Sequence, residues 1–464
     1  MMGMDSGRRK IVLIGAGSAV FTQGLVADLI VSPDLGPWEL GLVDIDPEAL
    51  DVATGLVRRM VNARPDADVV VSSSTDRREL LPGAHIVVAT IAVGGRRAWE
   101  LDVTIPRKYG VFQPVGDTVM PGGVSRALRM IPALVGIAED VGRLCPDALF
   151  VNYSNPLTAN CRAIRRATGV QVVGLCHGVP EVERHLARFA GIPAAEVSSL
   201  AVGVNHLTFF VELRWKGLDA WPLVRARLAE ERGESVDWAS IRRMYPEVGE
   251  KPADAPRVAH DPFSWSIFEA YGAYPAVNDR HVVEFFPQRF PGGSYYGKTL
   301  GVDVFSIERT IEDGDRAYQR MKAVAAGEEA APTWLFSRAP GEHEQLIDIV
   351  RSMATDAGRT FSMNLPNRGA VSGLPFEAVL EVPASARASG PYPLQLGEIP
   401  VALAAVLNRV IGAQELTVEA ALTGSRALFV EALLADGSVA DRATASRLAD
   451  ELLAAHRGHL PQFA

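Results

Sequence analysis

Short apolar runs alternate with stretches of helical spacing through the first two hundred residues of this chain. The runs are continuous, which is typical of strands buried on both faces of a parallel sheet. They lie at residues 10–15, 38–44, 66–71, 84–92, 148–153 and 170–175. Apolar residues recur with helical spacing at 19–30 and 126–142. This alternation predicts an α/β fold with a doubly wound parallel sheet.

A glycine-rich turn follows the first predicted strand. Gly15 and Gly17 precede a helix, and Asp44 ends the second strand. The glycines let the backbone approach a pyrophosphate, the helix N-terminus offers free N–H groups, and the aspartate can accept hydrogen bonds from a ribose diol. Val20 stands where a third glycine is usual, and Asp44 lies further on than the usual roughly 20 residues. The pattern predicts a Rossmann-like dinucleotide site, with an ordinary βα turn as the alternative.

After about residue 200 the pattern becomes mixed. Residues 204–213 and 377–383 are strand-like, and residues 401–407 and 418–434 have helical spacing. Residues 230–256 are charged and contain prolines, which favours a mobile loop or lid. We therefore expect a mixed α+β part to follow the parallel sheet.

Composition narrows the class of protein. Hydrophobic residues make up 48% and charged residues 22% of 464, which fits a globular protein with a sizeable core. The net charge of −9, without a basic stripe, argues against nucleic acid as the main partner. The 3 cysteines are too few for a disulfide framework. The sequence shows neither a signal peptide nor an 18-residue apolar span, so we expect a cytoplasmic protein with no membrane partner.

Polar residues follow the predicted strands between residues 152 and 206. Asn152 and Asn155 end one strand, Cys176 and His177 end the next, and His206 follows another apolar run. Thiolate and imidazole are metal ligands, and the carboxyl edge of such a sheet is where ligands bind. Buried core residues are the plain alternative. A nucleophilic Cys–His pair is a weaker one, because adjacent residues after a strand tend to point in different directions.

Two further stretches stand out. Residues 110–123 (GVFQPVGDTVMPGG) combine glycines and prolines that exclude regular structure, with Asp117 and Thr118 as their polar centre. Loops without periodicity are often functional, although a solvated surface loop is equally compatible. Residues 278–287 (NDRHVVEFFP) place titratable side chains before an apolar run, either as a solvated cluster or as a site with a base and an anion-binding arginine. They are Asp279, Arg280, His281 and Glu284.

A series of motifs resembles the family 4 glycoside hydrolases and extends over nearly the whole chain. They are GAGSAVF at 15–21, LVDID at 42–46, VGG at 93–95, VGDTVMPGG at 115–123, NYSNP at 152–156, GLCHG at 174–178, GVNH at 203–206, NLPNRG at 364–369 and LEVPA at 380–384. The VGDTVMPGG loop, CHG and DRHVVEF resemble the α-galacturonidase-like branch most. The 6-phospho-glycosidases of the family usually have Asp or Asn after the metal cysteine and a GGGS-type glycine loop, whereas His177 and GAGSAVF stand here.

The resemblance implies an unusual glycosidase reaction, an exception to the scheme with two carboxylates. NAD+ would take a hydride from C3 of the sugar, and the resulting ketone would acidify the proton on C2. A base would remove that proton while a divalent metal stabilised the enediolate. The glycosidic oxygen would leave by elimination, water would add, and NADH would reduce C3 again. The substrate class implied is an α-glycoside, with α-galacturonides or other uronosides as candidates.

The resemblance also implies the ligand and cofactor residues. Cys176 and His206 would hold Mn2+ or another divalent ion, and the preference for Mn2+ comes from the family, because mixed sulfur and nitrogen ligation also suits zinc. The residues implied for NAD are Gly15, Gly17, Ser18, Phe21, Asp44, Val93 and Asn152.

The catalytic and substrate residues complete the set. His177 would be the acid that protonates the leaving group, and Asp279 would be the base, with Tyr271 and Tyr274 as alternatives. The residues implied for the sugar are Asp117, Asn155, Asn205, Arg280 and His281. Arg280 or His281 would recognise a carboxylate on C6.

These inferences divide the chain and leave rival functions open. We expect an NAD-binding Rossmann-like domain at residues 1–200 and a mixed α+β catalytic and oligomerisation domain at 201–464, in a homo-dimer or homo-tetramer. An NAD-dependent dehydrogenase of the malate or lactate type is the main alternative, and a protein that only senses NAD is another. Cys176→Ser and His206→Ala should each abolish metal-dependent turnover and leave the fold intact.

Overall fold

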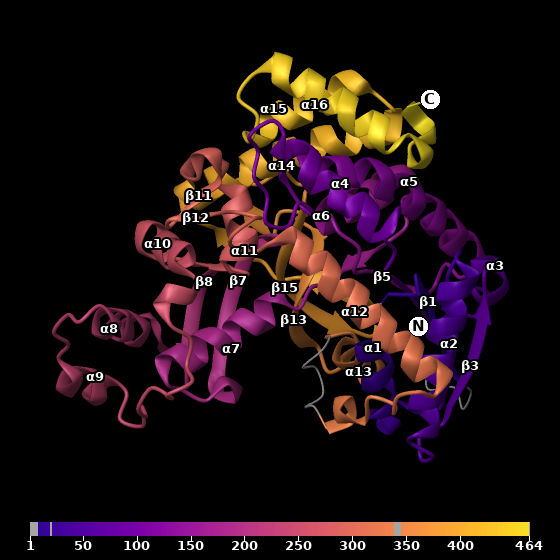
Figure 1. The fold of residues 1–464 in the computed structure, drawn as a ribbon. Helices are drawn as coiled ribbons and strands as arrows, with labels where there is room; N and C mark the ends of the chain where they lie inside the picture. Colours follow the sequence, from indigo (N-terminus) through magenta and orange to yellow (C-terminus); the bar gives the residue numbers. More distant parts are fainter. Residues whose placement is uncertain (1–7, 19–20, 338–344, 464) are drawn as a thin grey trace.

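A computed structural model describes residues 8–18, 21–337 and 345–463 of the chain. A 13-stranded sheet extends through these residues and carries helices on both faces (Figure 1). The α/β class with a Rossmann-like parallel sheet is therefore confirmed. The predicted helix start at Ala19 and the position of Val20 lie outside the described residues.

One half of the sheet is parallel. Its strands are β1 (Arg9–Ile14), β2 (Trp38–Val43), β3 (Val69–Ser74), β4 (Ile86–Ala89), β5 (Leu149–Asn152) and β6 (Val173–Gly174). Their order is β3-β2-β1-β4-β5-β6, and all neighbouring pairs are parallel. This is the strand order of dinucleotide-binding folds, and it puts the carboxyl ends of these strands on one edge.

The other half is antiparallel and continues from β6. Its main strands are β13 (Arg359–Pro366), β15 (Val379–Arg387), β7 (Val197–Val204), β8 (Leu207–Trp215) and β10 (Tyr274–Ala276), in that spatial order. Asn364 of β13 pairs with Gly174 of β6 and joins the halves. The two predicted domains thus share one continuous sheet, and the boundary at residue 200 stays a prediction.

Short strands complete the pairing. β9 (Leu218–Asp219) pairs with β8, and β16 (Gly390–Pro393) pairs with β15. Two small separate sheets are formed by β11 (Ser294–Tyr295) with β12 (Lys298–Thr299) and by β14 (Val371–Ser372) with β17 (Gly397–Glu398).

Alternate side chains of the parallel strands enter two different cores. Ile11 and Leu13 of β1 face one core, whereas Val12 and Ile14 face the other. The first core is covered by α1 (Phe21–Ile30), α2 (Pro47–Asn62), α12 (Ile307–Ala326) and α13 (Leu346–Ala354). The second is covered by α5 (Met120–Leu144) and α6 (Leu157–Thr168). Burial on both faces explains the continuous apolar runs of the sequence.

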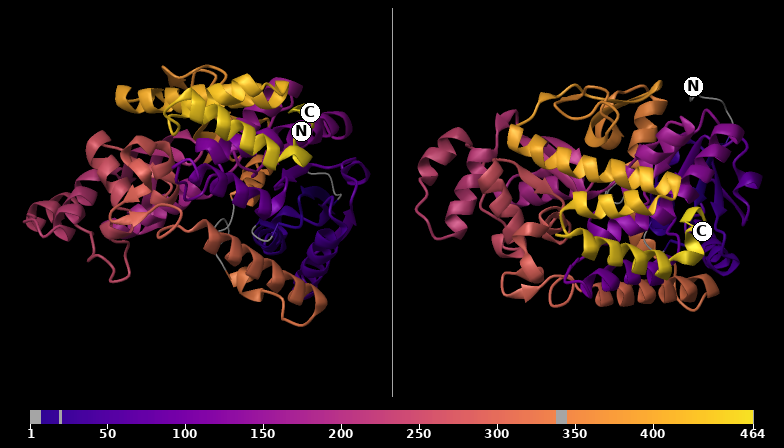
Figure 2. Two further views of the ribbon diagram at one scale, coloured as in Figure 1. Left: turned by 45° about the horizontal axis from the view of Figure 1, so that its top comes forward. Right: turned by 90° about the horizontal axis from the view of Figure 1, so that it is seen from above.

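The C-terminal helices form a further layer over α5 and α6 (Figures 1 and 2). They are α14 (Val401–Thr423), α15 (Arg426–Asp436) and α16 (Arg442–Ala455). Among the described helices, α14 alone is long and apolar enough to cross a membrane by length and composition. Its Leu407, Val410 and Val418 pack in a core with Phe429 of α15, and this burial explains its apolar composition.

A lobe of helices covers the antiparallel end of the sheet. It contains α7 (Gly178–Ala190), α8 (Trp221–Glu231), α9 (Trp238–Met244) and α10 (Pro262–Tyr271). Helices α8 and α9 project at the end of the molecule away from β3 (Figures 1 and 2). The sequence predicted only a loop or lid at 230–256, but α9 forms there because Asp237 caps its N-terminus through Ser240 N.

Two other local predictions are corrected. Residues 110–123 were expected to lack regular structure, yet α5 begins at Met120, since Pro121 in a first helical turn needs no N–H partner. The helical pattern at 418–434 is interrupted at Gly424, whose φ of +67° ends α14 before α15 starts.

A buried ionic network ties the C-terminus to the parallel half. Asp102 of α4 (Gly95–Arg107) accepts two hydrogen bonds from the Arg129 guanidinium, at 2.8 and 2.7 Å, and both side chains are 0% exposed. His456, just after α16, places Nε2 2.9 Å from the same carboxylate. Arg129 also donates to the carbonyl of Val93 at 3.3 Å. The network therefore connects the last helix to the loop after β4.

Candidate active site

The carboxyl edge of the parallel strands carries the predicted glycine turn. Gly15 has a φ of +90°, and a Cβ there would lie 2.8 Å from the carbonyl carbon of Thr90. A Cβ on Gly17 would lie 2.9 Å from Oδ2 of Asp44. Both positions require glycine because a side chain would collide with fixed neighbours. The turn is as closely packed as a pyrophosphate-binding loop needs to be.

Side chains on either side hold this turn. Gly17 N donates to Asp44 Oδ2 at 2.9 Å, and Phe21 N at the start of α1 donates to Ser18 Oγ at 3.3 Å. The structure therefore brings Gly15, Gly17, Ser18, Phe21 and Asp44 together as the sequence predicted. Their part in cofactor binding stays a prediction.

Val93 and Asn152 lie on the next two strand ends. Val93, after β4, donates its N–H to Met130 Sδ at 3.3 Å. Asn152 is fully buried, donates to the carbonyl of Ser154 and accepts from Ser154 N, both at 3.0 Å. The amide of Asn152 thus shapes the turn after β5. Its predicted contact with a cofactor stays a prediction.

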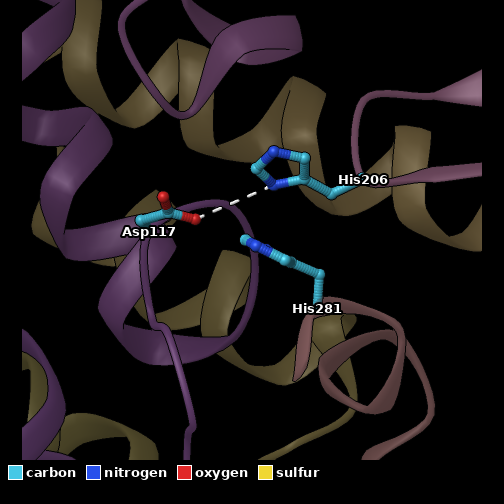
Figure 3. Close-up of side chains that lie close together, drawn as sticks. All are labelled: Asp117, His206 and His281. Atoms are coloured by element: carbon cyan, nitrogen blue, oxygen red, sulfur yellow. Dashed lines mark ion pairs between the residues drawn. The ribbon is translucent and has the colours of Figure 1, made fainter. Parts of the chain in front are cut away.

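Three side chains from distant segments converge near this edge. Asp117 comes from the loop before α5, His206 from the turn between β7 and β8, and His281 from α11 (Asp279–Val282) (Figure 3). Their ligand atoms lie within 4.8 Å of one another, and this is the one such group of three His, Cys, Asp or Glu side chains in the part of the chain described. The sequence had assigned Asp117 and His281 to the substrate rather than to a metal.

Hydrogen bonds fix the tautomer of His206. Thr118 Oγ1 donates to Asp117 Oδ1 at 2.7 Å and lies 2.8 Å from His206 Nδ1. A hydroxyl carries a single proton, so a Thr118 that donates to Asp117 accepts from Nδ1–H of His206. The lone pair of His206 is then on Nε2. A metal-ligating histidine usually donates its other ring N–H to an oxygen acceptor, and the Thr118 hydroxyl supplies such an acceptor here.

The protonation states also suit a cation. Burial would raise the pKa of Asp117, but interactions with the neighbouring His206 and His281, with the Arg126 guanidinium and with the Thr118 hydroxyl together outweigh it and hold the pKa below its usual value. Burial lowers the pKa of His206, and it lowers that of His281 well below the usual value. Near neutral pH the group therefore consists of a carboxylate and two neutral imidazoles, which are acceptors that a divalent metal can use.

The backbone at His206 is strained. Asn205 and His206 form the two-residue turn between β7 and β8, and His206 has a φ of +67°, a region that non-glycine residues rarely occupy. Asn205 N donates to Thr158 Oγ1 at 3.2 Å, which anchors the turn to α6. The Asn205 side chain, predicted to bind substrate, is fully buried. Strain of this kind is typical of functional sites, where it fixes the direction of a side chain.

Asn155 and Arg126 hold the Asp117 carboxylate of the cluster in place. Asn155 Nδ2 donates to Asp117 Oδ2 at 2.9 Å, so the amide predicted to bind substrate orients the carboxylate. Arg126 of α5 donates its Nε to the Asn155 carbonyl at 3.1 Å and contributes positive charge that lowers the pKa of Asp117. Arg126 was not predicted from the sequence as a site residue. The sequence feature that could have indicated this residue is an arginine among the small and apolar residues in the first turns of a long helix.

Cys176 and His177 lie between β6 and α7. Cys176 Sγ accepts from Gly178 N at 3.4 Å, at the helix N-terminus, where a thiolate is favoured. His177 is half exposed, with Nε2 3.9 Å from Glu181, and its charge lowers the pKa of His206. His177 thus interacts with the cluster, whereas Cys176 is not one of the three residues within 4.8 Å. Its role as a metal ligand stays a prediction.

Asp279, the predicted base, is fully buried. Its Oδ1 accepts from Ser264 N and Ser264 Oγ, and its Oδ2 accepts from Phe263 N and Tyr295 OH, at 2.6 to 2.8 Å. These contacts anchor the N-terminus of α10. Burial raises the pKa of Asp279, which suits a base near neutral pH, but proton transfer requires one of these hydrogen bonds to be exchanged.

The alternative bases are placed differently. Tyr274 is buried in the core of the lobe, and burial raises its pKa well above the ordinary value, so it is poorly suited to take a proton. Tyr271 is partly buried with its ring 6.5 Å from that of Phe286. Arg280, the predicted anion clamp, donates Nη2 to Thr310 at 2.8 Å, while its Nε is buried without a hydrogen-bond partner among the described residues.

A buried carboxyl at the centre of the sheet predicts how stability depends on pH. Glu381 of β15 accepts from Thr208 at 2.6 Å, and burial raises its pKa from 4.5 to about 7. The folded state therefore holds this proton more tightly than the unfolded state. The stabilisation is complete below about pH 4.5 and is lost as the pH rises through about 7, with a total of roughly 3 kcal/mol.

Glu381→Gln should remove this pH-dependent contribution to stability. Urea unfolding at pH 5 and pH 8 should show that the variant gains stability relative to the wild type as the pH rises, because the amide does not ionise. An equal difference between the two proteins at both pH values would contradict the raised pKa.

Comparisons with known proteins identify the family. The family model described as family 4 glycosyl hydrolase matches residues 10–192, and the model of its C-terminal domain matches residues 201–439. An α-glucosidase from Erwinia rhapontici is 32% identical over 92% of this chain and 93% of its own length. An α-galacturonidase from Bacillus subtilis is 28% identical over 96% of both chains.

A solved structure shows the same fold. The 6-phospho-β-glucosidase of Thermotoga maritima, solved with manganese, NAD+ and glucose 6-phosphate, is 23% identical and superposes with a TM-score of 0.77 over 97% of this chain and 99% of its own. The two family models together cover both halves of the continuous sheet. The resemblance found in the motifs is thereby confirmed, and the chain belongs to the family 4 glycosyl hydrolases.

Proposed function

We propose that this enzyme hydrolyses α-glycosides of uronic acids, α-galacturonides above all, with NAD and a divalent metal as cofactors. The observation that carries the proposal is the convergence of Asp117, His206 and His281 beside the carboxyl edge of a dinucleotide-binding sheet. Arg280 supports the uronate, because a guanidinium matches a carboxylate in shape and charge. The α-galacturonidase among the relatives points the same way.

The residues present fit both cofactors. A carboxylate and two neutral imidazoles are suitable donors for Mn2+, with Cys176 as a proposed further ligand. The close-packed turn at Gly15 and Gly17 offers backbone N–H groups. When bound, NAD+ supplies a reversible hydride acceptor for C3 of the sugar, and the metal supplies positive charge beside the oxygens on C2 and C3.

The chain's own groups would move the protons. His177, half exposed at the start of α7, is the proposed acid that protonates the leaving oxygen. Asp279 is the proposed base for the C2 proton, since its raised pKa makes it a stronger base than an exposed carboxylate. Asn155 keeps Asp117 in place. Abstraction at C2 with return of the hydride to C3 leaves no net oxidation, so NADH should not accumulate. A cytoplasmic location and a homo-oligomer stay predictions.

A panel of aryl glycosides tests the proposal. The purified enzyme, supplied with NAD+, Mn2+ and a thiol, would be assayed on α-galacturonide, α-glucuronide, α-glucoside, α-galactoside and the 6-phosphates. We expect release of the aryl group from the uronides, dependence on both cofactors and no accumulation of NADH. Steady NADH production from a hydroxy acid without glycoside cleavage would favour the dehydrogenase instead. NAD binding without any turnover would favour the sensor.

The proposed role of Asp44 can be tested through the affinity of the protein for NAD+. In Asp44→Ala, the affinity for NAD+ should fall about 10- to 100-fold, because a charged hydrogen bond to the ribose contributes roughly 1.5–3 kcal/mol. Titration of protein fluorescence with NAD+ measures the change. Asp46→Ala is a matched control, since Asp46 caps α2 through Glu48 N, two residues further on. Equal affinities in the wild type and Asp44→Ala would contradict the assigned role.

A further inference from the structure

The backbone just before Asp117 is held by a side chain from another part of the chain. Glu284 Oε1 accepts hydrogen bonds from Val115 N and Gly116 N, both at 2.8 Å. Glu284 is 2% exposed, and Gly116 adopts a left-handed φ of +61°. The carboxyl therefore binds the two peptide groups that lead directly into Asp117.

A cavity borders one side of this otherwise buried loop. A cavity of about 110 Å³ lies against it, lined on the loop side by Phe112 and Pro114 and on the other side by Glu284 and Phe290. A segment that borders a void lacks the contacts that hold a close-packed core in place. The two hydrogen bonds to Glu284, together with one from Trp99 Nε1 to the carbonyl of Val115 at 2.6 Å, fix the backbone that leads into Asp117.

Glu284 belongs to the same helical turn as His281. Helix α11 ends at Val282 and continues into a 3-10 turn, η4 (Val283–Phe285). Residues three apart in such a turn lie on the same side. One turn of chain therefore presents the imidazole of His281 and also grips the backbone that presents Asp117.

We propose that Glu284 is a positioning residue that sets the Asp117 carboxylate at metal-binding distance from His206 and His281. Without it, Asp117 would keep its bond from Asn155, but the backbone that carries it would lose its link to the turn of His281. Glu284 acts through Asp117 and contacts neither the metal nor the sugar.

The protonation of Glu284 determines which substitution is conservative. Burial raises the pKa of Glu284 to about 8. Since a neutral carboxyl still accepts at Oε1, glutamine should reproduce both bonds. Aspartate is one methylene shorter and cannot reach both N–H groups without a shift of the loop. Alanine removes the acceptor and leaves two buried N–H groups without a partner.

The affinity of the full chain for Mn2+ tests the inference, which rests on the proposed function. Titration with Mn2+ alone, followed by electron paramagnetic resonance of the free ion, should give near wild-type affinity for Glu284→Gln. Glu284→Asp and Glu284→Ala should lose affinity by about tenfold or more. Ser352→Ala, which removes a buried hydroxyl bonded to Ala386 O and Arg359 N elsewhere, is the control for general destabilisation and should bind Mn2+ normally.

A second variant separates positioning from simple destabilisation. In an Asp117→Ala background, Glu284→Asp should cause no further loss of Mn2+ affinity, because its effect passes through Asp117. Additive losses, or wild-type affinity in folded Glu284→Asp, would overturn the inference. If the wild type itself bound no Mn2+ and cleaved no glycoside, the proposed function would fail first, and the two failures are thereby distinguishable.

Discussion

Alanine at Asp117, His206 or His281, introduced one at a time, should reduce Mn2+-dependent glycoside cleavage by well over about a hundredfold. Substitution of groups that merely support a metal ligand costs roughly 10- to 100-fold, and loss of a ligand should cost more. The fold should persist, because the three side chains come from two loops and a short helix and not from the strands of the sheet. The measurements are kcat and KM on an aryl glycoside at saturating Mn2+ and circular dichroism for the fold.

The matched control is a histidine at the other edge of the sheet. His85 precedes β4, at the amino end of the strand, where its Nδ1 accepts from Lys10 N. His85→Ala should keep wild-type turnover. A chelator should abolish wild-type activity, and added Mn2+ should restore it. Wild-type rates in any of the three alanine variants would remove that residue from the metal site.

Cys176→Ser addresses the ligand that lies outside the group of three. We expect the variant to lose Mn2+-dependent turnover, since a serine hydroxyl is a far poorer metal ligand than a cysteine thiolate. Retained Mn2+ affinity in Cys176→Ser would restrict the ligand set to Asp117, His206 and His281.

Asp102→Asn should cause the largest loss of stability, about 3–5 kcal/mol. The substitution keeps the shape of the side chain but leaves the guanidinium of Arg129 buried without its counterion. His456 would lose the same partner. Urea unfolding at pH 7, followed by circular dichroism, measures the shift of the midpoint.

An exposed ion pair provides the comparison. Asp450→Asn breaks the bond to Arg426 on the surface of α15 and α16, where water screens the charges, and should change the midpoint little. Replacing Asp102 by leucine together with Arg129 by methionine should recover part of the lost stability, because no unpaired charge remains. An Asp102→Asn variant as stable as the wild type would show that the carboxylate is not needed to neutralise Arg129.

The parallel half of the sheet could be predicted from the sequence, whereas the antiparallel half could be predicted only in part. Strands buried on both faces, such as β1 and β4, carry continuous apolar runs that stand out locally. The strand-like stretches at 204–213 and 377–383 correspond to β8 and β15, and the apolar run before His206 belongs to β7. In contrast, β13 (RTFSMNLP) mixes polar and apolar residues and was not predicted as a strand. The place of β13 is set by pairing with β15, a long-range contact that no local pattern records.

The site shows the same division. The glycine turn and Asp44 follow from residues close together in the chain, and the structure places them as predicted. The meeting of Asp117 with His206 and His281 depends on how three loops fold over the sheet edge, so their shared role could not be inferred from spacing. The sequence nevertheless marked residues 110–123 and 278–287 as unusual, because glycine, proline and charged residues interrupt the apolar pattern there.

The continuous sheet also has a consequence during synthesis on the ribosome. The outer edge of β6 emerges early, but its partner β13 emerges only after Arg359. Until then, a nascent chain exposes an unpaired strand edge, which is a template for association with other chains. The carboxylate of Asp102 likewise has no contact with His456 until the residues after α16 have been synthesised. A chain stopped after the parallel half should therefore depend on chaperones and should not accumulate as an independent nucleotide-binding unit.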